Sequence, residues 1–277
     1  TDKNNKKVLT TDAVKFGGGT GNIERGGITS NVPKYAEGSR YWLQNSGFTP
    51  EVYNYTAEEK QQSDYKDDYF SKGLWVNELI EKFNVPVSLC VGIHTDAGKY
   101  QNDSIVGTLA IYTRLSENKD SYPDGTSRII SRELADIIQT QIVEDVRFLH
   151  DTAWTRRPVW DRSYVEARTP NVPSILLEMF AHQNYRDMKY GLDPEFQFTI
   201  SRAIYKGILK YTAHIKNKDY VVQPLPVKNF CTDIHFGSKT VARLQWDENI
   251  DPLEPTATAD NYIVYTQIID PKSNTPS

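Results

Sequence analysis

The sequence lacks several features that would assign a protein to a class directly. Its only cysteines among 277 residues, Cys90 and Cys231, lie far apart in the chain. Two such cysteines do not form a disulfide framework and do not indicate a redox compartment. No apolar run is long enough to span a bilayer. No signal peptide is visible either, so the chain as given is expected to be cytosolic or already mature.

The charge pattern excludes another class. The formal net charge is −4 and no basic stripe stands out, which argues against a general nucleic-acid binder. Hydrophobic residues make up 38% and aromatic residues 12%, which is enough for a sizeable core in a chain of one or two domains. The 17 tyrosines are the commonest aromatic residues and suit surfaces that contact polar ligands such as sugars.

Six glycines lie between residues 17 and 27, directly after an expected first strand at 8–16. A loop of this kind lets backbone approach a ligand closely, but a solvated turn is an equally ordinary outcome. No helix opens directly from the loop and no Gly-Lys-Ser/Thr follows, so it matches neither a dinucleotide fingerprint nor a P-loop. Its only charged residues are Glu24 and Arg25.

The residues after the glycine loop predict a helix over 33–44, a short strand over 51–55, an exposed loop over 56–68 and an amphipathic helix over 70–83. Glu37 lies early in the first of these helices, where a carboxylate suits the helix dipole.

Two apolar strands end in polar side chains. The stretch from Pro86 to Gly98 reads as a buried strand that ends in His94, Thr95 and Asp96. Open α/β sheets bind ligands at the carboxyl ends of such strands, although a histidine can also simply end a strand. Residues 172–179 form a second apolar strand that contains Glu178, and a buried carboxylate is costly unless it is paired or bound to metal.

Between these strands we expect a strand over 105–113, a long helix over 127–150 and a loop over 151–170. The loop is rich in aromatic and cationic residues and includes Arg157, Trp160 and Arg168. It could bind a ligand that carries a carboxylate or a sugar, or it could be a structural lid over the sheet edge.

The order of elements predicts an α/β fold with a mainly parallel sheet and helices on both faces, spanning residues 1–218. Its last helix starts at Asp193-Pro194. Residues 219–277 form a β segment, with strands expected at 227–234, 240–246 and 262–268. Three strands cannot close a sandwich, so the chain is either cut short or its tail leans on the first domain.

Two motifs support a resemblance to a family. Gly92-Ile93-His94-Thr95-Asp96 and Leu177-Glu178-Met179-Phe180 resemble strand ends of the zinc-dependent N-acetylmuramoyl-L-alanine amidases of type 3. In that family one strand ends in Ser-Ile-His-Ala-Asn, whose His binds zinc, and a later one in Val-Glu-x-Gly-Phe, whose Glu is catalytic. The resemblance implies that His94 binds one zinc ion and that Glu178 acts as general base and then as acid.

The family's other zinc ligands match less well. Its first ligand is the His of an Asp-Pro-Gly-His-Gly-Gly turn, but the glycine loop here has Gly21-Asn22 and no histidine. Its second ligand is a Glu near the first helix, for which Glu24 and Glu37 are the candidates. Either the missing ligands lie on sequence absent from this chain, or Asp96 or a water substitutes, or the site is inactive.

The resemblance also implies a substrate and a location. It predicts a secreted or envelope hydrolase, extracellular or periplasmic, that acts on peptidoglycan. Asp96, Arg157, Trp160 and Arg168 are the candidate substrate-binding residues. The alternative is an inactive module of the same fold that binds carbohydrate or peptidoglycan. The similarity looks closest to amidase-like proteins of Bacteroides-type bacteria, some named xanthan lyases, in which a fibronectin type III domain follows. Residues 219–277 resemble the first half of such a domain, but no residue supports action on another polysaccharide.

Overall fold

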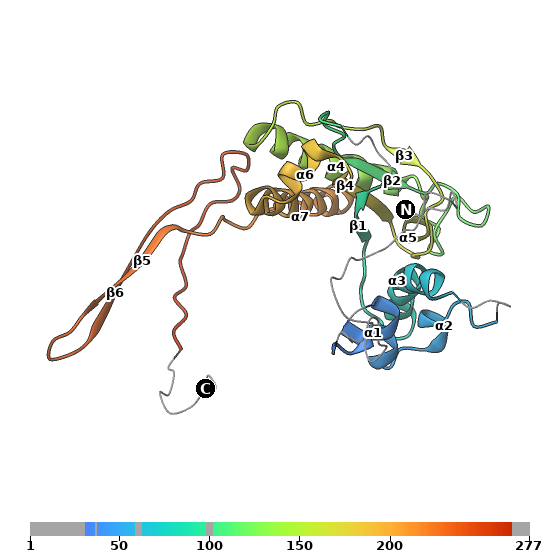
Figure 1. Ribbon diagram of the computed structural model, residues 1–277, viewed down its shortest axis with the longest axis horizontal. Coiled ribbons are helices and arrows are strands. Elements are labelled where there is room, and N and C mark those ends of the chain that lie inside the picture. Colours follow the sequence, from blue (N-terminus) through green and yellow to red (C-terminus); the bar gives the residue numbers. More distant parts are fainter. Residues whose placement is uncertain (1–30, 37, 59–62, 98–101, 268–277) are drawn as a thin grey trace.

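The computed structural model describes residues 31–36, 38–58, 63–97 and 102–267 (Figure 1). The expected strand at 8–16, the glycine loop with Glu24, and Glu37 lie outside these ranges. Within them, no helix combines the length and the apolar character needed to cross a membrane.

The described chain forms a mixed α/β architecture. The strands are β1 (Cys90–Asp96), β2 (Leu109–Tyr112), β3 (Trp160–Asp161), β4 (Ser174–Ala181), β5 (Lys228–His235) and β6 (Val241–Asp247). The α-helices are α1 (Ser39–Asn45), α2 (Pro50–Tyr53), α3 (Asp64–Glu81), α4 (Ile130–Leu149), α5 (Val165–Arg168), α6 (Tyr185–Gly191) and α7 (Pro194–Lys216), and a 3₁₀ turn, η1, spans Lys34–Ala36.

Strands β1 to β4 form one sheet in the order β1-β4-β2-β3. β1 pairs with β4 in parallel and β2 pairs with β3 in parallel, whereas β2 and β4 run antiparallel. The predicted α/β fold with a mostly parallel sheet is therefore confirmed. The central pair β2–β4 is the antiparallel exception, which the strand patterns alone do not predict.

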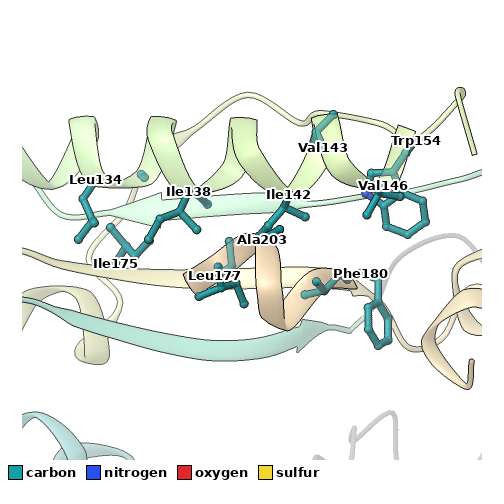
Figure 2. Close-up of a cluster of buried hydrophobic side chains, with 14 of the residues drawn as sticks. Leu134, Ile138, Ile142, Val143, Val146, Trp154, Ile175, Leu177, Phe180 and Ala203 are labelled. Carbon is teal, nitrogen blue, oxygen red and sulfur yellow. The ribbon is translucent and has the colours of Figure 1, made fainter. Parts of the chain in front are cut away.

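Helices α4 and α7 cover one face of the sheet and enclose the main core (Figure 2). Ile138 and Ile142 of α4 pack there with Ile175 and Leu177 of β4, and all four side chains are fully buried. The two helices approach closely at Gly207, where an added Cβ would lie 2.9 Å from Cα of Ile138. This core holds β4 rigidly, and β4 carries Glu178.

The other face of the sheet has a smaller cluster made by Leu109, Ile111 and Leu176, with Trp160 packed against it. Side chains two residues apart in a strand share a face, so Glu178 lies on the same side as Leu176. Helix α5 contacts β2 and β4, and α3 packs against α5. Helices therefore lie against both sides of the sheet, as predicted.

The amino-terminal helices differ from the sequence prediction in their limits. The strand expected at 51–55 is wrong, because Pro50 occupies the first position of the short helix α2, where its fixed φ favours a helix. Helix α3 starts at Asp64, inside the predicted loop, because the Ser63 side chain accepts a hydrogen bond from the backbone N–H of Lys66. The helix expected at 33–44 is instead split into η1 and α1.

Three short elements were not predicted. Strand β3 and helix α5 lie within the segment expected to be a loop, and α6 follows β4. The Asn184 side chain caps α6 by accepting a hydrogen bond from Asp187 N–H, and the buried Asp187 carboxylate accepts one from Ala181 N–H. These capping contacts tie the end of β4 to α6.

Up to residue 267, the carboxyl-terminal segment contains one hairpin, in which β5 and β6 pair antiparallel. The third strand expected at 262–268 does not form over the described residues 262–267. Its apolar residues include Ile263 and Tyr265, which are 75% and 88% exposed, so no packed face holds this stretch as a strand. The prediction of three strands is therefore wrong.

The described part of the segment that follows α7 packs back against that helix. Arg202 of α7 pairs with Asp251 at 2.9 Å, and Val222 and Ala257 are buried. Lys210 lies 3.8 Å from Glu254. These contacts hold the described part of the tail against helix α7. The boundary at 218/219 stays a prediction.

Candidate active site

His94 and Glu178 lie side by side on the sheet. They are partners in the parallel pairing of β1 and β4, and Glu178 also pairs with Leu109 of β2. Since paired residues on adjacent strands point to the same face, the imidazole and the carboxylate emerge together. The geometry thus brings together the two residues that the strand motifs single out.

Glu178 is half-buried, and its Oε2 atom is enclosed without a hydrogen-bond partner among the described residues. Burial raises the pKa of Glu178 to about 7, and the negative charge of Asp96 adds to the effect. The positive charges of His94 and Arg157 act in the opposite direction. A carboxyl group with this pKa can both take up and release a proton near neutral pH.

His94 is held by a carboxylate from outside the sheet. Its Nε2 contacts Oε2 of Glu166 on α5, and the other oxygen of Glu166 pairs with Lys72 Nζ of α3 at 3.0 Å. The hydrogen bond with Glu166 raises the pKa of His94, although burial opposes it. Burial pushes the pKa of Glu166 upward, but His94 and Lys72 outweigh this and lower it. The three side chains form a chain of ionic contacts, Lys72–Glu166–His94.

Gly92 leaves space for this chain. It precedes His94 by two residues on β1, and a Cβ at this position would lie 2.7 Å from Oε2 of Glu166 and 3.6 Å from Nε2 of His94. Any larger residue here would compete with the carboxylate for the same volume.

Asp96 and Arg157 form an ion pair beside Glu178. Asp96 Oδ2 and Arg157 Nη1 are 2.7 Å apart, and Arg157 is 9% exposed. The Arg157 guanidinium lies 5.3 Å from the ring centroid of Trp160. Of the predicted substrate-binding residues, Asp96 and Arg157 thus lie close enough to Glu178 to act on its charge, and Trp160 packs against the smaller apolar cluster.

Arg168 does not join this group. Its Nη1 donates to the carbonyl of Ser163 at 2.9 Å, and its guanidinium lies 5.6 Å from the ring centroid of Phe70. Glu24 and Glu37 lie outside the described residues. The substrate-binding role of Arg168 and the ligand roles of the two glutamates stay predictions.

Sequence reasoning missed Lys72 and Glu166 as site residues. Glu166 stands between Val165 and Ala167 in a four-residue helix and is 7% exposed. A charged residue between apolar neighbours is a weak signal of burial, and such a residue needs a partner. That partner, His94, is 72 positions away along the chain, so only the fold identifies it.

A cavity of about 570 Å³ opens beside His94 and Glu166. Its walls include Trp42, Trp75 and Ile93, so most of its lining is apolar. Its size is that of a pocket for a small ligand or for part of a larger one.

The donor atoms near His94 do not by themselves make a zinc centre. A catalytic zinc ion takes three protein ligands and keeps one position open. Within the ranges that the structure describes, no group of three His, Cys, Asp or Glu side chains could hold a metal. The Nε2 atom of His94, moreover, already contacts Glu166. The described residues therefore do not fit the implied metal.

The sheet presents a histidine and a buried carboxylate on neighbouring strands. This makes the chain an α/β protein with a polar site on one face of its sheet. The comparison with protein families makes the assignment specific. The chain belongs to the family N-acetylmuramoyl-L-alanine amidase (Amidase_3), whose model matches residues 34–210. This confirms the resemblance at the level of the family.

Solved structures similar to the chain include an N-acetylmuramoyl-L-alanine amidase from Clostridium difficile 630. It is 19% identical, with a TM-score of 0.41, over 58% of this chain and 78% of that one. The CwlD amidase from Clostridioides difficile, solved in complex with the GerS lipoprotein, is 23% identical over 63% and 81% of the two chains, with a TM-score of 0.41. The amidase AmiC2 of Nostoc punctiforme is 23% identical over 49% and 62%, with a TM-score of 0.38. A search of curated proteins found no match.

Proposed function

We propose that this protein hydrolyses the amide bond between N-acetylmuramic acid and L-alanine in peptidoglycan, with Glu178 as the residue that transfers protons. The observation that carries the proposal is geometric. Glu178 lies beside His94 in a family whose members are amidases, and it keeps a buried oxygen without a hydrogen-bond partner among the described residues.

In the proposed mechanism Glu178 first accepts a proton from the water that attacks the amide carbonyl. It then donates that proton to the amide nitrogen as the carbon–nitrogen bond breaks. Asp96 helps to keep the pKa of Glu178 high enough for the second step, and Arg157 holds Asp96 in place. Glu166 fixes the orientation of the His94 ring next to the reacting groups.

The predicted zinc ion is not used in these steps, because the donor atoms described do not complete a site for it. Zinc bound by His94 with Glu24 or Glu37 stays a prediction that elemental analysis of the purified protein can test. We expect about one zinc per chain if these ligands complete the site. A protein that cleaves peptidoglycan at full rate after exhaustive chelation would exclude a catalytic zinc.

The central experiment compares wild type with Glu178→Gln on purified peptidoglycan. Amide cleavage exposes new alanine amino groups, which can be labelled and quantified. Loss of a general acid–base residue is expected to lower the rate by about 10²–10⁴-fold. Glu195→Gln is the matched control, because Glu195 is exposed near the start of α7. Cleavage by Glu178→Gln at the wild-type rate would refute the proposed role.

A second candidate function is a module of the same fold that binds glycan without cleaving it. The observation that favours it is the Lys72–Glu166–His94 chain, which occupies the ring nitrogen of the histidine. This alternative predicts that the protein sediments with insoluble peptidoglycan and that no alanine amino groups appear. Binding with cleavage supports the amidase, and binding without cleavage supports the module.

A substrate in peptidoglycan places the proposed activity in the cell envelope, as an extracellular or periplasmic protein. The finer relationship to Bacteroides-type proteins named xanthan lyases also remains a proposal, as does a partial fibronectin type III segment over 219–277. The hairpin β5–β6 would supply two strands of such a domain.

A further inference from the structure

A second cavity of about 570 Å³ lies away from Glu178, near the end of the sheet where β4 begins. Its walls come from helix α3, from the loop at 116–123 that follows β2, and from residues 168–171 that precede β4. Helix α5 connects the two places, because it carries Glu166 of the first site and Arg168 of this cavity. The cavity is therefore distinct from the candidate active site, although it lies close to it along the chain.

Cationic side chains dominate the charge of this cavity. Arg128, Arg168 and Lys119 line it, and Glu117 is the single acidic residue among its lining residues. No carboxylate of the described chain lies within 4.0 Å of any of the three cations. Glu117 only adds a favourable charge interaction with Arg128 from a greater distance.

Arg128 is the unusual member of this group, because it is only 4% exposed. Its Nη2 donates to the carbonyl of Arg168 at 3.1 Å, but Nε and Nη1 have no hydrogen-bond partner in the described part of the chain. Its guanidinium lies 4.3 Å from the ring centroid of Tyr122, which compensates for part of its charge. Burial accordingly lowers the pKa of Arg128. A buried cation without a carboxylate partner is costly, and a bound anion would remove that cost.

The cavity also offers a flat aromatic surface. The rings of Tyr55 and Phe70 stack with centroids 3.9 Å apart, and Tyr55 remains 48% exposed. Asn77 bonds both the carbonyl of Thr169 and the N–H of Asn171, so this amide is already satisfied within the wall. The cations and the aromatic face are the lining groups that select the chemistry of a ligand.

We propose that this cavity binds a carboxylate-bearing glycopeptide, with the carboxylate near Arg128, Arg168 and Lys119 and the sugar ring against Tyr55. Arginine suits carboxylates because its planar donors match the two oxygens, and an aromatic face suits the apolar side of a sugar. The choice of a glycopeptide rests on the proposed function, since muramyl peptides combine a sugar ring with a free carboxylate. The site would hold a second part of the substrate away from the bond that is cut.

The test measures binding by calorimetry with the full chain carrying Glu178→Gln, which prevents turnover. The probe is muramyl dipeptide, and the neutral comparison ligand is a chitin trisaccharide. We expect saturable binding of the dipeptide, weaker binding of the neutral sugar, and loss of at least about tenfold in affinity on Lys119→Gln or Arg128→Met. Arg132→Gln, an exposed arginine of α4 outside the cavity, is the matched control and should bind like its parent.

Arg128 is buried, so its variant must first show the parent's melting temperature. Lys119 is exposed, which keeps the test decisive if Arg128→Met does not fold. Equal binding of charged and neutral ligands, or unchanged affinity in Lys119→Gln, would overturn the proposal. So would an affinity loss confined to Arg157→Gln, because that would place the dipeptide beside Glu178.

The two proposals fail in different ways. If the protein binds the dipeptide through the cavity but never cleaves peptidoglycan, the proposed amidase activity is wrong and the binding site stands. If wild type cleaves peptidoglycan and cavity variants bind and cleave normally, the site is wrong and the activity stands.

Discussion

His94 of β1 and Glu178 of β4 are register partners on adjacent parallel strands, so an imidazole and a carboxylate leave the sheet at the same point. Of the two side chains, only Glu178 has a buried polar atom, Oε2, without a hydrogen-bond partner in the described chain. This arrangement has a thermodynamic consequence, because a carboxyl group that is hard to ionise in the folded state makes stability depend on pH.

Glu178→Gln is expected to stabilise the protein at pH 8 and to flatten its pH dependence. The folded-state pKa of Glu178 is about 7, against an ordinary value of 4.5, so the folded protein binds more protons in this interval. Stability therefore falls as pH rises from about 4.5 to 7, and the loss is complete above 7. The gain at pH 8 should be about 1–3 kcal/mol, since water reaches part of the side chain.

Urea unfolding at several pH values checks this expectation, with Glu195→Gln as the control. At pH 4 the variant and wild type should have similar free energies of unfolding, because Glu178 is then protonated in both states. Parallel stability curves for the variant and wild type across the whole range would contradict the assigned pKa.

Lys206→Met is expected to destabilise the protein strongly. Lys206 Nζ and Asp145 Oδ2 are 2.6 Å apart, with side chains 1% and 4% exposed, between helices α7 and α4. The single variant leaves Asp145 buried without its cation, which costs about 3–5 kcal/mol. The double variant Lys206→Met, Asp145→Leu should recover most of this loss. Unfolding followed by circular dichroism measures both, and a loss below about 1 kcal/mol for the single variant would be inconsistent with a buried pair.

Gly207→Ala should destabilise the protein although alanine favours helices. Helix propensity alone would add about 1 kcal/mol. The new Cβ, however, would lie 2.9 Å from Cα of Ile138, which is backbone and cannot rotate away. We expect a net loss of about 1–3 kcal/mol, seen as a lower melting temperature. Ser201→Ala, on an exposed position of α7, should not lower it.

Arg202→Gln should release the carboxyl-terminal segment from α7. Arg202 bonds Asp251 and also the carbonyl of Gln223, both at 2.9 Å, so it links two points of that segment to the helix. Limited proteolysis between α7 and β5 should become faster, while Lys216→Gln, an exposed control, should be cleaved like wild type. If the two variants are cleaved equally, residues 219–277 behave independently of α7, which would support the predicted domain boundary.

Strands and helices with a distinctive local sequence pattern could be predicted from the sequence. β1 and β4 are apolar and bounded by turn residues, and α4 and α7 show apolar side chains at helical spacing. Asp193 and Pro194 mark the start of α7 correctly, because capping is a local interaction. His94 and Glu178 stand out for the same reason, as polar residues in apolar strands.

Features that depend on distant partners could not be predicted. The pattern of β2 is the same whether it runs parallel or antiparallel to β4, so its direction is decided by the connection around it. The sequence around Glu166 does not reveal its contacts with Lys72 and His94, because these partners lie far away in the chain and no sequence motif links them to Glu166. The stretch at 262–267 has strand-like residues but pairs with no strand among the residues that the structure describes.

The absence of a side chain at Gly92 limits which residues the site accepts at this position. The related family strand ends in Ser-Ile-His, and a serine at 92 would put its Cβ 2.7 Å from Oε2 of Glu166. The carboxylate would have to swing away and give up its contact with His94. Serine at 92 would therefore cost the site its Glu166–His94 contact. Gly92 and Glu166 are for this reason a linked pair, which an engineer would have to exchange together.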